Sequence, residues 1–130
     1  MNSLARPYLC GGINGCTDSE ANDWREDVIK VFPLSINPMI RDYRGREDEC
    51  YREIVEGDIV DIESCHVLLV NYTKPSVGSA MEVYMAYHMG KRVILWCDES
   101  ATLSPWLRYH SHDIVHSLED AVGKVEAWAQ

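Results

Sequence analysis

Two short apolar runs constrain the fold of this chain most strongly. They are 66–70 (HVLLV) and 92–96 (RVILW), and between them residues 74–90 read as a tight turn leading into a helix that ends at Gly90. Continuous apolar runs of this length are typical of strands buried on both faces of a parallel sheet. The order strand, helix, strand therefore predicts a parallel βαβ unit.

The same alternation extends over the rest of the chain. We expect three further strands, at 6–10, 34–37 and 113–116, and further helices at about 17–31, 50–62 and 117–128. Thr17 or Asp18 would cap the first of these helices, and Ser117 with Asp120 the last. No repeat or linker-like segment interrupts the pattern. We therefore expect one domain, 1–130, with an α/β, Rossmann- or flavodoxin-like three-layer sandwich and a parallel five-stranded sheet.

Charge and composition exclude several classes of protein. The net charge is −9 with no offsetting cluster of Lys and Arg, so duplex nucleic acid is not an expected partner. The five cysteines are an odd number without zinc-site spacing, which favours reduced thiols in the cytoplasm. No stretch approaches the roughly 18 apolar residues of a membrane span. We expect a cytoplasmic protein with no membrane partner, no metal and no cofactor.

The loops after the strands are where a ligand is expected. In such sheets ligands bind beyond the carboxyl ends of the strands, at the point where the strand order reverses. After the first strand, Gly11 and Gly12 would let the backbone approach a ligand, or would form a plain glycine turn. The loop lacks the GxGxxG pattern and no acidic residue ends the second strand, which disfavours a dinucleotide.

Two further loops carry polar groups with alternative interpretations. Arg41, Asp42 and Arg44 could hydrogen-bond a heterocycle or clamp a phosphate, or they could form a solvated charged loop. The loop at 73–79 ends at a helix N-terminus, where Ser76 could bind an anion or a sugar hydroxyl, or could simply cap the helix.

Two acidic residues stand among apolar neighbours. Glu82 lies between Met81 and Val83, early in its helix. It is either a surface glutamate stabilised by the helix dipole or a carboxylate held in a pocket as a nucleophile. Asp58 lies on the apolar face of an earlier helix and is placed to point toward the ends of the strands.

Taken in order, these motifs resemble the nucleoside 2-deoxyribosyltransferase family, including the 2′-deoxynucleoside 5′-monophosphate N-glycosidases. The matching segments, between 8 and about 96, are YLCGGI (8–13), PMIRDYRG (38–45), Asp58–Ile59 and PSVGSAME (75–82). The 24 residues from Asp58 to Glu82 are similar to the spacing in the monophosphate glycosidases. Gly12 departs from the pattern, because members often carry Pro or Ser there.

The resemblance implies an enzyme that cleaves or transfers the N-glycosidic bond of 2′-deoxynucleosides or their 5′-monophosphates through a deoxyribosyl-glutamate intermediate. Glu82 would attack C1′, Asp58 would protonate the departing base or orient the sugar, and Tyr8 would orient Glu82. Substrate contacts are implied for Gly11, Gly12, Ile13, Arg41, Asp42, Arg44, Ser76 and Gly78. A homodimer or larger homo-oligomer is also implied, with 104–109 at the interface or in a neighbour's pocket.

Two other functions remain as alternatives. The first is a non-catalytic nucleotide-binding or sensing module on the same fold. The second is a phosphoacceptor signalling domain, which would need acidic residues after the first strand and an Asp after the central one. Those positions hold Gly11–Gly12 and Asn71, which disfavours the signalling domain.

Overall fold

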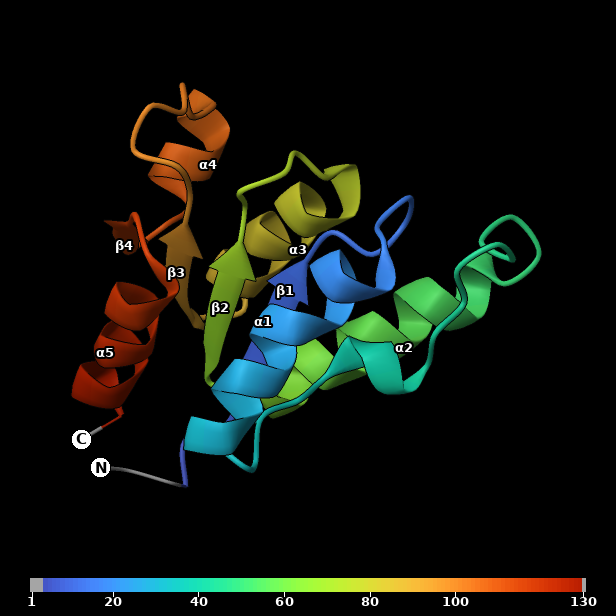
Figure 1. The fold of residues 1–130 in the computed structure, drawn as a ribbon, viewed down its shortest axis with the longest axis horizontal. Coiled ribbons are helices and arrows are strands. Elements are labelled where there is room, and N and C mark those ends of the chain that lie inside the picture. Colours follow the sequence, from blue (N-terminus) through green and yellow to red (C-terminus); the bar gives the residue numbers. More distant parts are fainter. Residues whose placement is uncertain (1–3, 130) are drawn as a thin grey trace.

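The computed structural model describes residues 4–129 and shows a parallel β-sheet between two layers of helices (Figure 1). The strands, paired in the order β1-β2-β3-β4, are β1 (Pro7–Gly11), β2 (Val67–Asn71), β3 (Arg92–Trp96) and β4 (Asp113–Val115). The helices are α1 (Asp18–Val31), the 3₁₀ helix η1 (Pro38–Ile40), α2 (Tyr51–Ser64), α3 (Val77–His88), α4 (Pro105–Tyr109) and α5 (Leu118–Trp128). The predicted α/β class and parallel sheet are confirmed. Residues 1–3 and 130 of the expected domain lie outside the described residues.

The prediction of a fifth strand at 34–37 is wrong. Ile36 forms only an isolated parallel bridge with Tyr8. Two backbone hydrogen bonds support the bridge, from the Leu9 N–H to the Ile36 carbonyl (3.0 Å) and from the Ile36 N–H to the Pro7 carbonyl (2.8 Å). Pro38 lacks an N–H and begins η1, so the pairing stops there. The described sheet has four strands, and Ile36 lies beside the outer edge of β1.

The two faces of the sheet bury different side chains because residues alternate along each strand. Leu9, Leu69 and Ile94 pack in one cluster with apolar residues of α1 and α5. Tyr8, Cys10 and Leu68 pack in the other, with residues of α2, α3 and α4. Tyr8 and Cys10 therefore face the layer that contains the two acidic residues singled out in the sequence.

Local capping explains where the helices begin. Thr17 and Glu20 form a capping box at α1, and Ser117 accepts from the Asp120 N–H at α5. At α3, Ser76 accepts from the Ser79 N–H, and Gly90, with φ of 79°, follows the end of the helix. Helix α4 was not predicted, although Ser104 before Pro105 is a typical helix start.

Arg25 is a fully buried cation beneath the end of β1. From α1 it donates to the carbonyls of Leu9 (3.2 Å), Ala21 (2.6 Å) and Gly11 (3.2 Å). Its guanidinium also lies over the ring of Trp24, 4.7 Å from the centroid. Arg25 thus fixes the strand end from which the first glycine loop departs.

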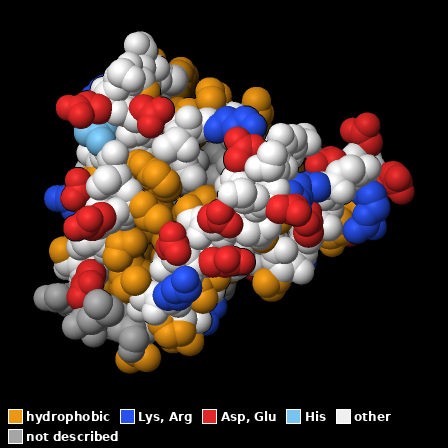
Figure 2. Space-filling view, in the orientation of Figure 1, with side chains coloured by type: hydrophobic (Ala, Val, Ile, Leu, Met, Phe, Trp, Pro, Cys, Tyr) orange, Lys and Arg blue, Asp and Glu red, His pale blue; other side chains and the backbone are white. Residues whose placement is uncertain are grey.

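The surface is dominated by acidic groups. Figure 2 shows Asp and Glu side chains spread across the visible face with few Lys or Arg among them, as expected for a net charge of −9. No helix within residues 4–129 combines the length and the apolar character needed to cross a lipid bilayer.

The contacts of Arg25 predict that Arg25→Ala destabilises the protein. The substitution removes three charge-assisted hydrogen bonds and leaves a cavity, so we expect a loss of about 2–4 kcal/mol in the free energy of unfolding. Urea denaturation measures this change. Arg52→Ala, on the exposed face of α2, is the control and should change stability by less than about 0.5 kcal/mol. Equal stability of the two variants would contradict a structural role for Arg25.

Candidate active site

A pocket of about 310 Å³ lies at the carboxyl ends of β1 and β2. The chain leaves β1 on one side, toward the bridge at Ile36, and returns on the other side as β2, so the direction in which it crosses the sheet reverses at this point. This is the position expected from the sequence for a ligand. The residues that line the pocket are Tyr8, Gly11, Ile13, Asn14, Pro38, Arg41, Tyr43, Arg44, Glu47, Tyr51, Ile54, Val55, Asp58, Ser76, Gly78, Ser79 and Glu82.

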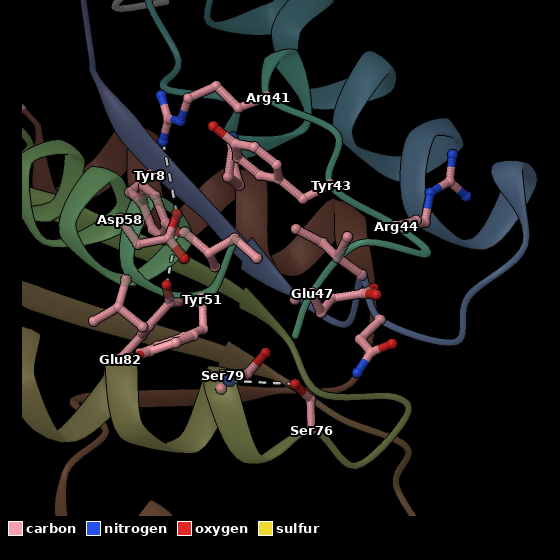
Figure 3. A pocket seen from close by; sticks show the side chains of 17 residues that line it. Tyr8, Arg41, Tyr43, Arg44, Glu47, Tyr51, Asp58, Ser76, Ser79 and Glu82 are labelled. Carbon is pink, nitrogen blue, oxygen red and sulfur yellow. Dashed lines mark hydrogen bonds and ion pairs between the residues drawn. The ribbon is translucent and has the colours of Figure 1, made fainter. Parts of the chain in front are cut away.

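Two donors from β1 hold the carboxylate of Glu82. The Tyr8 hydroxyl donates to Oε2 at 2.8 Å, and the Cys10 thiol donates to Oε1 at 3.3 Å. Tyr8 and Cys10 are two residues apart on one strand and therefore point to the same face of the sheet. Both oxygens of Glu82 are thus oriented by a rigid, buried strand, and Figure 3 shows Tyr8 beside the carboxylate.

Asp58, from α2, lines the pocket together with Glu82, and its charge acts on the Glu82 carboxyl group. Arg41 holds Asp58 from the other side: its Nη2 lies 3.6 Å from Asp58 Oδ1 and 2.5 Å from Asp61 Oδ2. Gly57 makes room for this arrangement, because a Cβ there would lie 3.1 Å from Arg41 Nε. Arg41 is therefore paired with acidic residues of α2.

The surroundings favour a proton on the pair of acidic groups. The pKa of Glu82 is raised well above its ordinary value. The largest cause is the loss of water around the carboxylate, and the second is the charge of Asp58. Burial is the main cause that raises the pKa of Asp58. Burial and the charge of Glu82 also raise the pKa of Tyr8, which stays a neutral donor. A single proton on the two groups would leave one carboxylate beside one carboxylic acid.

The other predicted residues fall into two groups. Of the residues expected from the sequence, Tyr8, Gly11, Ile13, Arg41, Arg44, Asp58, Ser76, Gly78 and Glu82 line the pocket. Gly12 instead lines an adjoining hollow of about 280 Å³, together with Cys16 and Lys74. Asp42 does not line the pocket and accepts from the guanidinium of Arg44.

Arg44 joins its loop to the start of α1. Its guanidinium contacts Asp42 Oδ2 (2.8 Å), Asp18 Oδ1 (2.7 Å) and the Cys16 carbonyl (3.2 Å). The hydrogen bonds from Arg44 lower the pKa of Asp42. Figure 3 shows the guanidinium pointing away from the pocket. The aliphatic part of the Arg44 side chain is therefore the part that lines the pocket.

Several residues that line the pocket or hold Glu82 were missed in the sequence. Cys10 could have been found, because it is two residues after Tyr8 on a strand, and Ser79 because it is three residues after Ser76 on a helix. Tyr43, Tyr51 and Glu47 carry no such local signal, since the course of the 41–50 loop decides whether they reach the pocket.

The pocket has an apolar wall and a polar end. Tyr43, Tyr51, Ile54 and Val55 form a wall suited to a planar ring, and the N-terminus of α3 supplies N–H and hydroxyl groups. Within the described residues 4–129, no group of three or more His, Cys, Asp or Glu side chains is arranged to hold a metal ion. The arrangement suits attack by a carboxylate on a ligand held between the wall and the helix.

Solved structures of known proteins share this fold. A 2-deoxyribosyltransferase from Bacillus psychrosaccharolyticus aligns with a TM-score of 0.74 at 15% identity, over 91% of this chain and 90% of that one. A conserved protein from Enterococcus faecalis V583 aligns with a TM-score of 0.70 at 12% identity, over 96% and 99%. A CMP N-glycosidase from Clostridium botulinum aligns with a TM-score of 0.55 at 20% identity, over 93% and 98%. At these identities the likeness shows the fold alone.

Sequence comparison identifies the family. No curated protein matches the sequence significantly. The model of the family described as nucleoside 2-deoxyribosyltransferase matches residues 8–124. Since this match covers most of the chain, including the whole pocket and all but the first residue of the four described strands, the chain belongs to the nucleoside 2-deoxyribosyltransferase family.

Proposed function

We propose that the protein cleaves or transfers the N-glycosidic bond of 2′-deoxynucleosides or their 5′-monophosphates, with Glu82 as the nucleophile. The observation that carries the proposal is the carboxylate of Glu82, held by Tyr8 and Cys10 in the pocket and adjacent to Asp58. Membership of the family supports it, as does the fold shared with a 2-deoxyribosyltransferase and a CMP N-glycosidase.

In the first step the reactive form carries the proton of the pair on Asp58, an oxygen of the ionised Glu82 attacks C1′, and the bond from C1′ to the base nitrogen breaks. Its electron pair leaves with the base, which takes the proton from Asp58. The product is a deoxyribosyl ester of Glu82, and Asp58 is left ionised beside Arg41. Tyr8 keeps its hydrogen bond to the other oxygen of Glu82 and so holds the reacting group in place.

In the second step the ester is opened. Water, or a nitrogen of a second base, attacks C1′, Asp58 takes the proton, and Glu82 leaves as a carboxylate. This returns the single proton to the pair of acidic groups. Water as acceptor gives a hydrolase and a base gives a transferase.

The pocket suggests how the substrate lies. The base would lie against the wall formed by Tyr43, Tyr51, Ile54 and Val55. The 5′ end would lie at the N-terminus of α3, near Ser76 and Gly78. The sugar between them would then present C1′ to Glu82. The free thiols of the five cysteines support the cytoplasm as the place of the reaction.

The alternative of a nucleotide sensor differs in one measurable property. A sensor would bind the ligand without releasing base, in the wild type as well as in a Glu82 variant. The orientation of Glu82 by two donors favours the enzyme, because binding alone does not require an oriented nucleophile.

Glu82→Gln is expected to abolish base release. The amide still accepts from Tyr8 but is a poor nucleophile, so we expect a loss of at least about 10³-fold in kcat. Chromatography of 2′-deoxynucleosides and their 5′-monophosphates, incubated with and without an acceptor base, measures release and exchange. Glu56→Gln, at an exposed position on α2, is the matched control. A wild type that leaves every deoxy substrate intact would overturn the proposed enzyme.

The raised pKa of Glu82 predicts a pH-dependent stability. The folded protein binds this proton more tightly than the unfolded chain, so stability is lost as the pH rises from 4.5, the ordinary pKa of Glu, through the raised value. Glu82→Gln should therefore raise the free energy of unfolding at pH 7 by about 1–3 kcal/mol, with the difference vanishing toward pH 4.5. Urea denaturation across this pH range measures it, and a difference that grows at low pH would contradict the assignment.

We also propose that a second copy of the chain covers the outer face of α3 and α4. Met81, Tyr84, Trp106 and Tyr109 are at least half exposed there, and Tyr84, Trp106 and Tyr109 line a hollow of about 420 Å³ between the helices. Exposed apolar groups gathered in this way are typical of interfaces.

A charge placed on this face should break the association. We expect Trp106→Glu to convert a dimer or larger oligomer to monomer, because the interface would have to bury an unpaired carboxylate. Light scattering coupled to size-exclusion chromatography measures the mass. Leu34→Glu, which adds the same charge on the loop after α1, should leave the mass unchanged. A wild type that is already monomeric would contradict the proposed interface.

A further inference from the structure

Ser79 carries a buried hydroxyl without a partner in the pocket. The residue is 2% exposed and lines the pocket, and its Oγ has no hydrogen-bond partner among residues 4–129. Buried hydroxyl groups in native proteins are nearly always hydrogen-bonded, so such an exception calls for a specific reason. The backbone N–H of Ser79 is already used, since it donates to Ser76 Oγ at 3.2 Å.

The position of Ser79 on α3 relates it to the proposed nucleophile. Ser76, Ser79 and Glu82 follow one another at three-residue intervals and line the same pocket. Successive members are displaced by about 4.5 Å along the helix axis. Figure 3 shows the hydroxyl of Ser79 pointing into the pocket, above the helix and between the other two residues. A ligand with C1′ at Glu82 and its 5′ end near Ser76 would place its sugar over Ser79.

The direction from which Glu82 attacks C1′ decides which atom of that sugar the Ser79 hydroxyl can contact. A nucleophile attacks C1′ from the face opposite to the departing base. In a natural 2′-deoxynucleoside the base lies on one face of the sugar ring and the 3′-hydroxyl on the other. Glu82 and the 3′-hydroxyl therefore lie on the same side of the ring. The ring oxygen is a poor partner for a donor, because it becomes electron-deficient as the glycosidic bond breaks.

We propose that the hydroxyl of Ser79 hydrogen-bonds the 3′-hydroxyl of the deoxyribosyl unit and makes that group a determinant of specificity. This rests on the proposed function, because it takes C1′ to be at Glu82. The contact supplies the partner that Ser79 Oγ lacks within the described residues. It also fixes the rotation of the sugar so that C1′ faces the carboxylate.

Paired substrates test the contact. We would measure kcat/KM for 2′-deoxyadenosine and 2′,3′-dideoxyadenosine, and for the corresponding 5′-monophosphates, with the wild type and with Ser79→Ala. The wild type should prefer the 3′-hydroxyl by about tenfold, because the dideoxy analogue leaves a buried hydroxyl unpaired. Ser79→Ala should lose about tenfold on the deoxy substrate and little on the dideoxy one, so that the preference falls to near one.

Two controls separate this contact from a structural role. Ser76→Ala should lower kcat/KM for both members of a pair equally and keep the preference for the 3′-hydroxyl. Ser79→Ala should be at least as resistant to urea as the wild type, because it removes a buried group that lacks a partner. A loss that is equal on both substrates would show that Ser79 binds water or shapes the helix, and would overturn the inference. A preference for the 3′-hydroxyl that is unchanged in Ser79→Ala would also overturn the inference.

A binding measurement keeps this inference separate from the proposed function. If the wild type released no base, the proposed reaction would fail, and calorimetry with Glu82→Gln would then compare the Kd values of 2′-deoxyadenosine and its dideoxy analogue. The inference expects an about tenfold difference that disappears when Ser79→Ala is added. Equal Kd values for the two ligands would overturn it.

Discussion

The hydrogen bond from Tyr8 to Glu82 joins the first strand to the helix after the second strand, between residues 74 positions apart. It forms because Tyr8 points toward the layer of α2 and α3, while its neighbour Leu9 packs under α1. The carboxylate that it holds has lost much of its water, which is costly unless the group is hydrogen-bonded or keeps a proton. Tyr8 and Cys10 supply the hydrogen bonds, and burial together with the neighbouring Asp58 raises the pKa of Glu82.

The rest of the site compensates for these buried charges. Arg41 crosses α2 at Gly57, a residue that weakens a helix, to reach Asp58 and Asp61. Arg25 donates hydrogen bonds to the carbonyl groups of Leu9 and Gly11 at the end of β1, where the first glycine loop begins. Two arginines thus support the site, Arg41 at the wall of the pocket and Arg25 outside it, and neither role follows from the pattern of the sequence.

Much of the fold was predictable because it depends on local periodicity. The apolar runs of β2 and β3, the capping residues of α1 and α5 and the glycine after α3 each carry their own signal. The segment 34–37 was misjudged because its apolar residues resemble a strand, whereas pairing depends on its neighbours, and Pro38 limits it to one bridge. Helix α4 was missed because five residues are too few to show a helical period.

The site was predictable where a residue's place on an element decides its direction. Tyr8, Asp58 and Glu82 line the pocket because strand and helix geometry project them toward the end of the sheet. Arg44 and Asp42 differ, since a loop can direct a long side chain either way, and here Arg44 binds both Asp42 and Asp18. By itself the sequence determined the order of the elements, the apolar faces and the acidic residues available for chemistry. Only the tertiary structure decided which of those acidic groups are buried side by side, which cations are already paired and which hydroxyl lacks a partner among residues 4–129, because these properties arise from contacts between segments distant in the chain.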